Sequence, residues 1–146
     1  MKQFTARKVV LRPGADKAAY THALRLAEAA AKVAPNDGNV VQTLGAAQYR
    51  TGCFAAAVAT LTESDKLNTR DDGRPDKDDL GFLAMAQHRL GLKAQALETL
   101  ARMREVMKQP RWANFPEGHF LLREAEETLQ QKPASETTKD AKSSEK

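Results

Sequence analysis

The chain has 146 residues, of which 41% are hydrophobic and only 5% aromatic. This length suits one domain with one core, and a core with so little aromatic bulk is typical of closely packed, alanine-rich helices. The formal charge of +4 is uneven, because residues 1–14 carry +4, residues 131–146 carry +1 and the remainder carries −1. The basic balance therefore does not indicate a nucleic-acid surface on the folded part.

The first predicted elements are a basic arm and a helix. Residues 1–15 hold four basic side chains and no acidic one, which predicts a frayed or linker-like N-terminal arm. An alanine-rich helix follows over about 16–34, and Pro35 ends it. One face of this helix is lined by Tyr20, Ala23, Leu24, Ala27 and Ala30.

An internal repeat comes next. The stretch Ala47–Gly52 returns as Ala86–Gly91, so the two copies are offset by 39 residues (47 to 86). Each copy predicts a helix, a glycine stop and a second helix, because glycine adopts the left-handed conformation at a helix end without strain. The second helices carry the apolar stripes Phe54, Ala57, Val58 and Leu61, and Ala96, Leu97, Leu100 and Met103.

The segments after each copy are expected to be polar or irregular until a last helix. A polar loop is predicted over Asn68–Asp79, and an irregular segment between Pro110 and Pro116. A final helix over about 117–130 has an apolar side of Phe120, Leu121, Ala125 and Leu129, which is how a repeat array closes its exposed end. Residues 131–146 lack bulky apolar side chains and predict a disordered polar tail.

This pattern resembles the tetratricopeptide repeat (TPR) family over residues 18–130. The match runs through Leu44-Gly45, Gly52, Phe54, Ala57, Leu61 and Leu67, and again through Leu83-Ala84, Gly91, Ala96 and Leu100. The resemblance implies an all-α, short solenoid of antiparallel helix pairs over residues 16–130 with a C-terminal capping helix. It implies that the helix over 16–34 is the second helix of a repeat whose first helix is missing or degenerate.

The segments 44–50 and 82–91 are similar to TPR tails of large bacterial proteins, many of them serine/threonine kinases. No kinase domain is present, since the glycine-rich loop and the catalytic-loop and metal-binding aspartate motifs are absent from the sequence. Two departures from the family are the spacing of 39 residues instead of 34 and the small number of repeats.

The family's inner-groove positions imply a peptide-binding surface on the first helix of each pair. They correspond in this sequence to Asn39, Gln42, Ala46, Tyr49 and Arg50, and to Asp78, Gly81, Met85, His88 and Arg89. Arg50 and Arg89 occupy matching places, and guanidinium groups bind carboxylates through paired hydrogen bonds. The sequence therefore favours a scaffold or adaptor module that binds a protein or peptide partner, which an arginine pair would make an acidic one.

Two other functions compete with this interpretation. A short array with an unpaired first helix could bury that edge against a second copy and form a homodimer. The basic arm could contact nucleic acid, but four charges with one aromatic residue, Phe4, give only weak and salt-dependent binding.

Catalysis, metal binding and membrane insertion are not expected. His22, His88 and His119 lack ligand spacing, and the single Cys53 fits neither a disulfide nor a multi-cysteine zinc site. No nucleophile–base constellation is evident, so we expect no enzyme activity and no cofactor. No apolar run approaches a membrane span or a signal-peptide core, and a cytoplasmic location is the default expectation.

Overall fold

The computed structural model describes residues 2–132, with the side chains from Thr5 onward. This part of the chain is all-helical, as the composition predicts. Its helices are α1 (Lys2–Leu11), α2 (Lys17–Val33), α3 (Gly38–Arg50), α4 (Phe54–Asp72), α5 (Lys77–Arg89), α6 (Lys93–Met107), α7 (Pro110–Ala113) and α8 (Pro116–Gln130).

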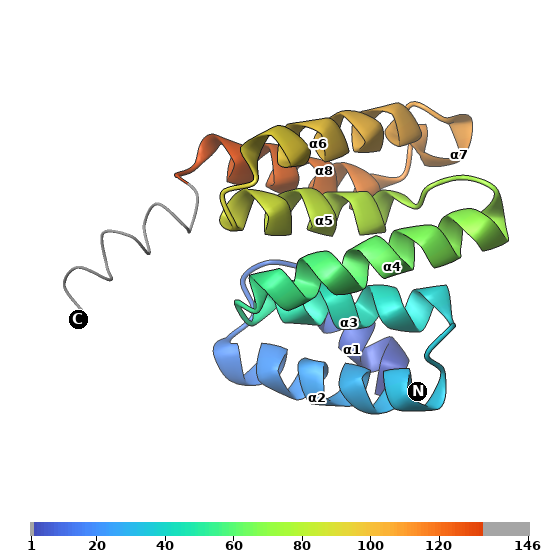
Figure 1. Ribbon diagram of the computed structural model, residues 1–146, viewed down its shortest axis with the longest axis vertical. Helices are drawn as coiled ribbons and strands as arrows, with labels where there is room; N and C mark the ends of the chain where they lie inside the picture. Colours follow the sequence, from blue (N-terminus) through green and yellow to red (C-terminus); the bar gives the residue numbers. More distant parts are fainter. Residues whose placement is uncertain (1, 133–146) are drawn as a thin grey trace.

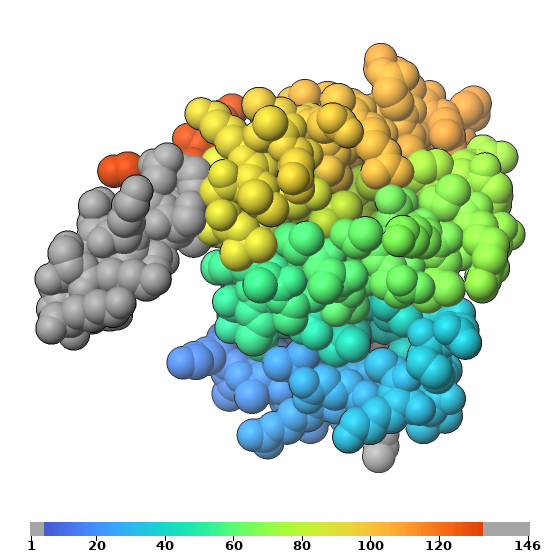
Figure 2. Space-filling model, viewed as in Figure 1, coloured from blue at the N-terminus to red at the C-terminus, as the bar shows by residue number. Residues whose placement is uncertain are grey.

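The helices pack against consecutive neighbours as a repeat-like array (Figure 1). Helices α1, α3, α5 and α8 contact one another in that order and form one layer. Helices α2, α4 and α6 form the outer layer, each packed against the helices that precede and follow it in the first. In Figure 2 the outer helices form successive bands from α2 in blue to α6 in yellow.

Three turns link the two layers at one end of the array. The turns α1–α2, α3–α4 and α5–α6 each contain a glycine in the left-handed region: Gly14 at φ 92°, Gly52 at φ 86° and Gly91 at φ 82°. All three turns lie on the left in Figure 1. We call this end, residues 12–17, 50–54 and 89–93, the turn edge.

Helix α5 lies at the centre of the molecule, and every residue from Lys77 to His88 is buried. Its close packing depends on Gly81, where an added Cβ would lie 2.8 Å from the Leu121 side chain of α8. Gly45 of α3 is in the same way close to Leu61 of α4. These contacts explain how an alanine-rich chain with few aromatic residues builds a dense core.

Helix α1 corrects the expected arm. Residues 2–11 form a helix that packs against α2 and α3, and its Ala6 and Val10 are completely buried. Helix α2 therefore has a preceding partner helix, and Gly14 stands in its turn as Gly52 and Gly91 do in theirs.

The connecting segments also differ from expectation. The polar stretch Asn68–Asp79 is mostly helical, because α4 continues to Asp72 and α5 begins at Lys77. The segment between Pro110 and Pro116 contains the short helix α7. The expected disordered tail, 131–146, lies outside the described residues after Lys132.

Two leucines of α6 test the assignment of the buried face. Leu100 is 2% exposed, whereas Leu97, expected on the same stripe, is 53% exposed, and Phe120 of α8 is likewise exposed. We expect Leu100→Ala to lower the free energy of unfolding by about 2–5 kcal/mol, since it empties a packed site. Leu97→Ala, the same chemical change on the same helix, should cost well under half of that in urea denaturation. Equal losses would contradict the helix orientation.

Candidate binding surface

Most of the predicted groove positions are buried by the protein's own chain. Asn39 is exposed and Arg89 half-buried, while the other residues of this set lie inside. The buried members are Gln42, Ala46, Tyr49, Asp78, Gly81, Met85 and His88, together with the side chain of Arg50. The inner face of α3 and α5 is therefore covered in this structure.

Helix α1 covers the first part of that face. The Arg7 guanidinium donates to Asp78 Oδ2 at 3.1 Å and to the side-chain oxygen of Gln42 at 2.5 Å. Burial raises the pKa of Asp78, and the charges of Lys77 and Arg7 oppose this shift. Arg7 is thus occupied, which removes part of the basis for nucleic-acid binding by a free basic arm.

Helix α8 covers the second part. Leu121 packs over Gly81, and the Thr128 hydroxyl lies 3.5 Å from the Met85 sulfur. His88 Nε2 is 2.7 Å from the carbonyl oxygen of Gln131, directly after α8. This geometry makes Nε2 the donor, while Nδ1 is buried without a partner among the described residues.

Arg50 connects both covering helices. Its Nε donates to the carbonyl of Val10 at 2.8 Å. Its Nη2 donates to the carbonyl of Leu11 at 3.3 Å and to Glu124 Oε1 at 2.9 Å. A second contact joins Nη1 to the other Glu124 oxygen. The guanidinium also lies 5.0 Å from the Phe82 ring centroid. Arg50 is therefore already paired and does not form the predicted open arginine pair with Arg89.

Arg89 lies apart from this network, at the turn edge. Its Nε is 3.5 Å from the Tyr49 hydroxyl, and its guanidinium lies 6.0 Å from the Phe54 ring centroid. No carboxylate of the described residues pairs with it. Its charge remains available to a partner.

The turn edge as a whole is basic. Exposed Arg12 and Lys17 lie at the α1–α2 turn and exposed Lys93 at the α5–α6 turn, and none has a carboxylate partner within residues 5–132. The acidic residue there, Asp16, accepts the backbone N–H of Ala19 as the N-cap of α2. Sequence reasoning missed Arg12, Lys17 and Lys93 as a group, although their positions beside Gly14 and Gly91 were a usable signal.

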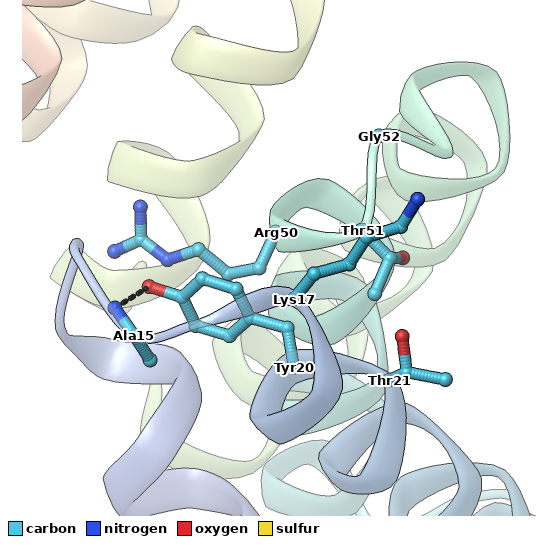
Figure 3. Close-up of a pocket in the computed structure, with 7 residues that line it drawn as sticks. All are labelled: Ala15, Lys17, Tyr20, Thr21, Arg50, Thr51 and Gly52. Carbon is cyan, nitrogen blue, oxygen red and sulfur yellow. Dashed lines mark hydrogen bonds between the residues drawn. The ribbon is translucent and has the colours of Figure 1, made fainter.

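A cavity of about 390 Å³ opens at the same edge, between the start of α2 and the α3–α4 turn (Figure 3). Its lining residues are Ala15, Lys17, Tyr20, Thr21, Arg50, Thr51 and Gly52. Among the described residues there is no group of three or more His, Cys, Asp or Glu side chains that could hold a metal ion. None of the described helices is long and apolar enough to cross a membrane.

Comparison with known proteins adds no relative. No protein-family model matches the chain, and no curated protein or solved structure matches it either.

Proposed function

We propose that this chain is a TPR-like protein-interaction module, a scaffold or adaptor without catalytic activity, acting in the cytoplasm. Its partner is an acidic segment of another protein. The unpaired cations of the turn edge are the observation that supports this proposal, because opposite charges steer a partner to a surface and set its orientation.

The location of the binding surface differs from the family's inner groove. That groove is filled by α1 and α8, whose contacts bury Gln42, Asp78 and Met85. At the turn edge, Arg12, Lys17, Arg89 and Lys93 have no carboxylate partner among the described side chains. The connections at the opposite end, 34–37, 73–76 and 108–115, contain three basic and two acidic residues, so their excess of positive charge is smaller than that of the turn edge.

Self-association through an unpaired first helix is not supported by this packing. The edge of α2 that the hypothesis needs is covered by α1, with Ala6 and Val10 buried in the core.

The test is a capture experiment with the tagged full chain and native cytoplasmic extract. Proteins retained by the wild type at low salt should be lost from the variant Arg89→Gln plus Lys93→Gln, with binding weakened about tenfold or more. The control variant, Lys32→Gln plus Lys66→Gln, removes the same charge from exposed positions away from the turn edge and should capture the same proteins. Raising the salt should weaken capture by the wild type and the control alike.

Equal capture by both variants would contradict the turn edge as the binding surface. Melting temperatures measured beside the capture experiment exclude unfolding as the cause of any loss.

A further inference from the structure

One wall of the cavity at the turn edge consists of groups that already make hydrogen bonds within the protein. The Tyr20 hydroxyl donates to the carbonyl of Arg12 and accepts the backbone N–H of Ala15 at 3.2 Å. The Arg50 guanidinium is directed to Glu124 and to the end of α1. In Figure 3 these groups lie together on the left, and they already make hydrogen bonds within the protein.

The opposite side of the cavity is open and carries polar side chains. Figure 3 shows the Lys17 amine and the Thr21 and Thr51 hydroxyls on the side away from the Arg50 guanidinium. The Thr51 hydroxyl is held at its own helix end by the carbonyls of Ala47 and Gln48, at 2.9 and 3.1 Å. Lys17 and Thr21 have no side-chain hydrogen-bond partner within the described part of the chain.

The free groups determine which ligand suits the cavity. An ammonium group offers three donors and no acceptor, and the Thr21 hydroxyl can donate one more hydrogen bond. Asp16, the adjacent acid, is directed to the backbone N–H of Ala19. A ligand that supplies only acceptors and a negative charge therefore complements this side of the cavity.

We propose that the cavity binds one carboxylate of the partner, with Lys17 as the cation and Thr21 as the hydroxyl donor. This assignment rests on the proposed function, since it identifies one contact point of the acidic segment at the turn edge. The carboxylate comes either from an acidic side chain or from a free chain terminus, and both present the same pair of oxygen atoms.

Three synthetic tripeptides separate these sources in an NMR titration of the ¹⁵N-labelled full chain. Acetyl-Gly-Asp-Gly-amide offers a side-chain carboxylate, acetyl-Gly-Gly-Gly with a free C-terminus offers a terminal one, and acetyl-Gly-Asn-Gly-amide offers none. We expect at least one of the two acids to shift the amide signals of Thr21, Thr51 and Gly52 in a saturable manner. The stronger of the two identifies the source, and the asparagine peptide should leave these signals in place.

Matched lysine variants connect the shifts to the cavity. Lys17→Gln should weaken the response about tenfold or more, whereas Lys32→Gln, at the other end of the same helix, should leave it unchanged. The proposal is overturned if neither acid shifts these signals, if the asparagine peptide shifts them equally, or if Lys17→Gln responds as the wild type does.

The two proposals fail separately. Partner capture that depends on Arg89 and Lys93 while Lys17→Gln captures normally would remove the cavity assignment and leave the turn edge in place. Carboxylate binding in the cavity without charge-dependent capture would remove the turn edge as the partner surface.

Discussion

Replacing Asp79 with asparagine should remove a large part of the pH dependence of folding. Asp79 is completely buried on α5. Its Oδ1 lies 2.5 Å from the Ser64 hydroxyl oxygen, and its Oδ2 accepts from the Asn68 amide at 2.8 Å. The Ser64 hydroxyl is also 3.2 Å from the carbonyl oxygen of Gly38. The Ser64 hydroxyl has only one proton to donate. When Ser64 donates it to the Gly38 carbonyl, the proton of the Ser64–Asp79 hydrogen bond comes from a protonated Asp79.

The electrostatics of the site agree with a protonated carboxyl group. Burial is the main cause that raises the pKa of Asp79 from 3.8 to about 7, and the negative charge of Asp76 adds to it. Hydrogen bonds that Asn68 and Ser64 donate to the ionised carboxylate oppose the shift. Lys77, Asp78 and Arg7 belong to the adjacent charge network of α5 and α1.

The sign of the pH dependence follows from proton binding. Between about pH 4 and pH 7 the native carboxyl holds a proton that the unfolded chain has released, so stability falls as the pH rises. A difference of roughly three pKa units corresponds to at most about 4 kcal/mol. Below pH 4 the contribution is fully present, and above pH 7 it is lost.

Urea denaturation at pH 5 and pH 8 measures this effect. The wild type should lose stability between the two values, and Asp79→Asn should lose clearly less, because the neutral amide cannot ionise and can still donate to Ser64. The exposed residue Asp71 provides the control, since Asp71→Asn should retain the wild-type slope. Identical slopes for the wild type and Asp79→Asn would show that this carboxyl group is not protonated in the native state.

The sequence predicted the helices of the repeat but not the full length of α4, which continues into the predicted loop. The offset of 39 residues and the glycines Gly52 and Gly91 located α3 to α6, because a helix-ending glycine is a strong local signal. The last part of α4 was not predicted because its buried side chains there include the polar residues Ser64 and Asn68, which hydrogen-bond to Asp79. Apolar periodicity does not detect a polar face that is buried in this way.

The same limit applies to the candidate site. The resemblance placed Gln42, Met85 and their neighbours on the inner face, but no local pattern says what covers a face. Helix α1 buries Ala6 and Val10, but its position also depends on Arg7 and on the carbonyl groups that Arg50 binds. Contacts between residues 35 to 74 positions apart, such as Arg7–Gln42 and Arg50–Glu124, are set by tertiary packing.

Arg50→Met should destabilise the protein by roughly 3–5 kcal/mol, the usual loss when one partner of a buried ion pair is removed. The Arg50 and Glu124 side chains are only 5% and 18% exposed. Methionine keeps much of the apolar stem but leaves the Glu124 carboxylate and the carbonyls of Val10 and Leu11 without their donor.

The matched control is Arg102→Met on the outer layer. Arg102 pairs with Asp65 at 3.1 Å, but its side chain is 43% exposed, so its loss should cost no more than about 1 kcal/mol. Adding Glu124→Gln to Arg50→Met should recover part of the lost stability, because it removes the unpaired buried charge.

Hydrogen exchange then distinguishes a connecting role from a general loss of stability. Relative to the wild type, Arg50→Met should increase the amide exchange rates of α1 and α8 more than those of α4 and α6, because α1 and α8 lose their common contact. The hypothesis of an open arginine pair requires the opposite result. In an open pair with Arg89, Arg50 would contact only the partner, so its removal would weaken partner binding and leave the melting temperature unchanged. An Arg50→Met variant that melts as the wild type does would restore that hypothesis.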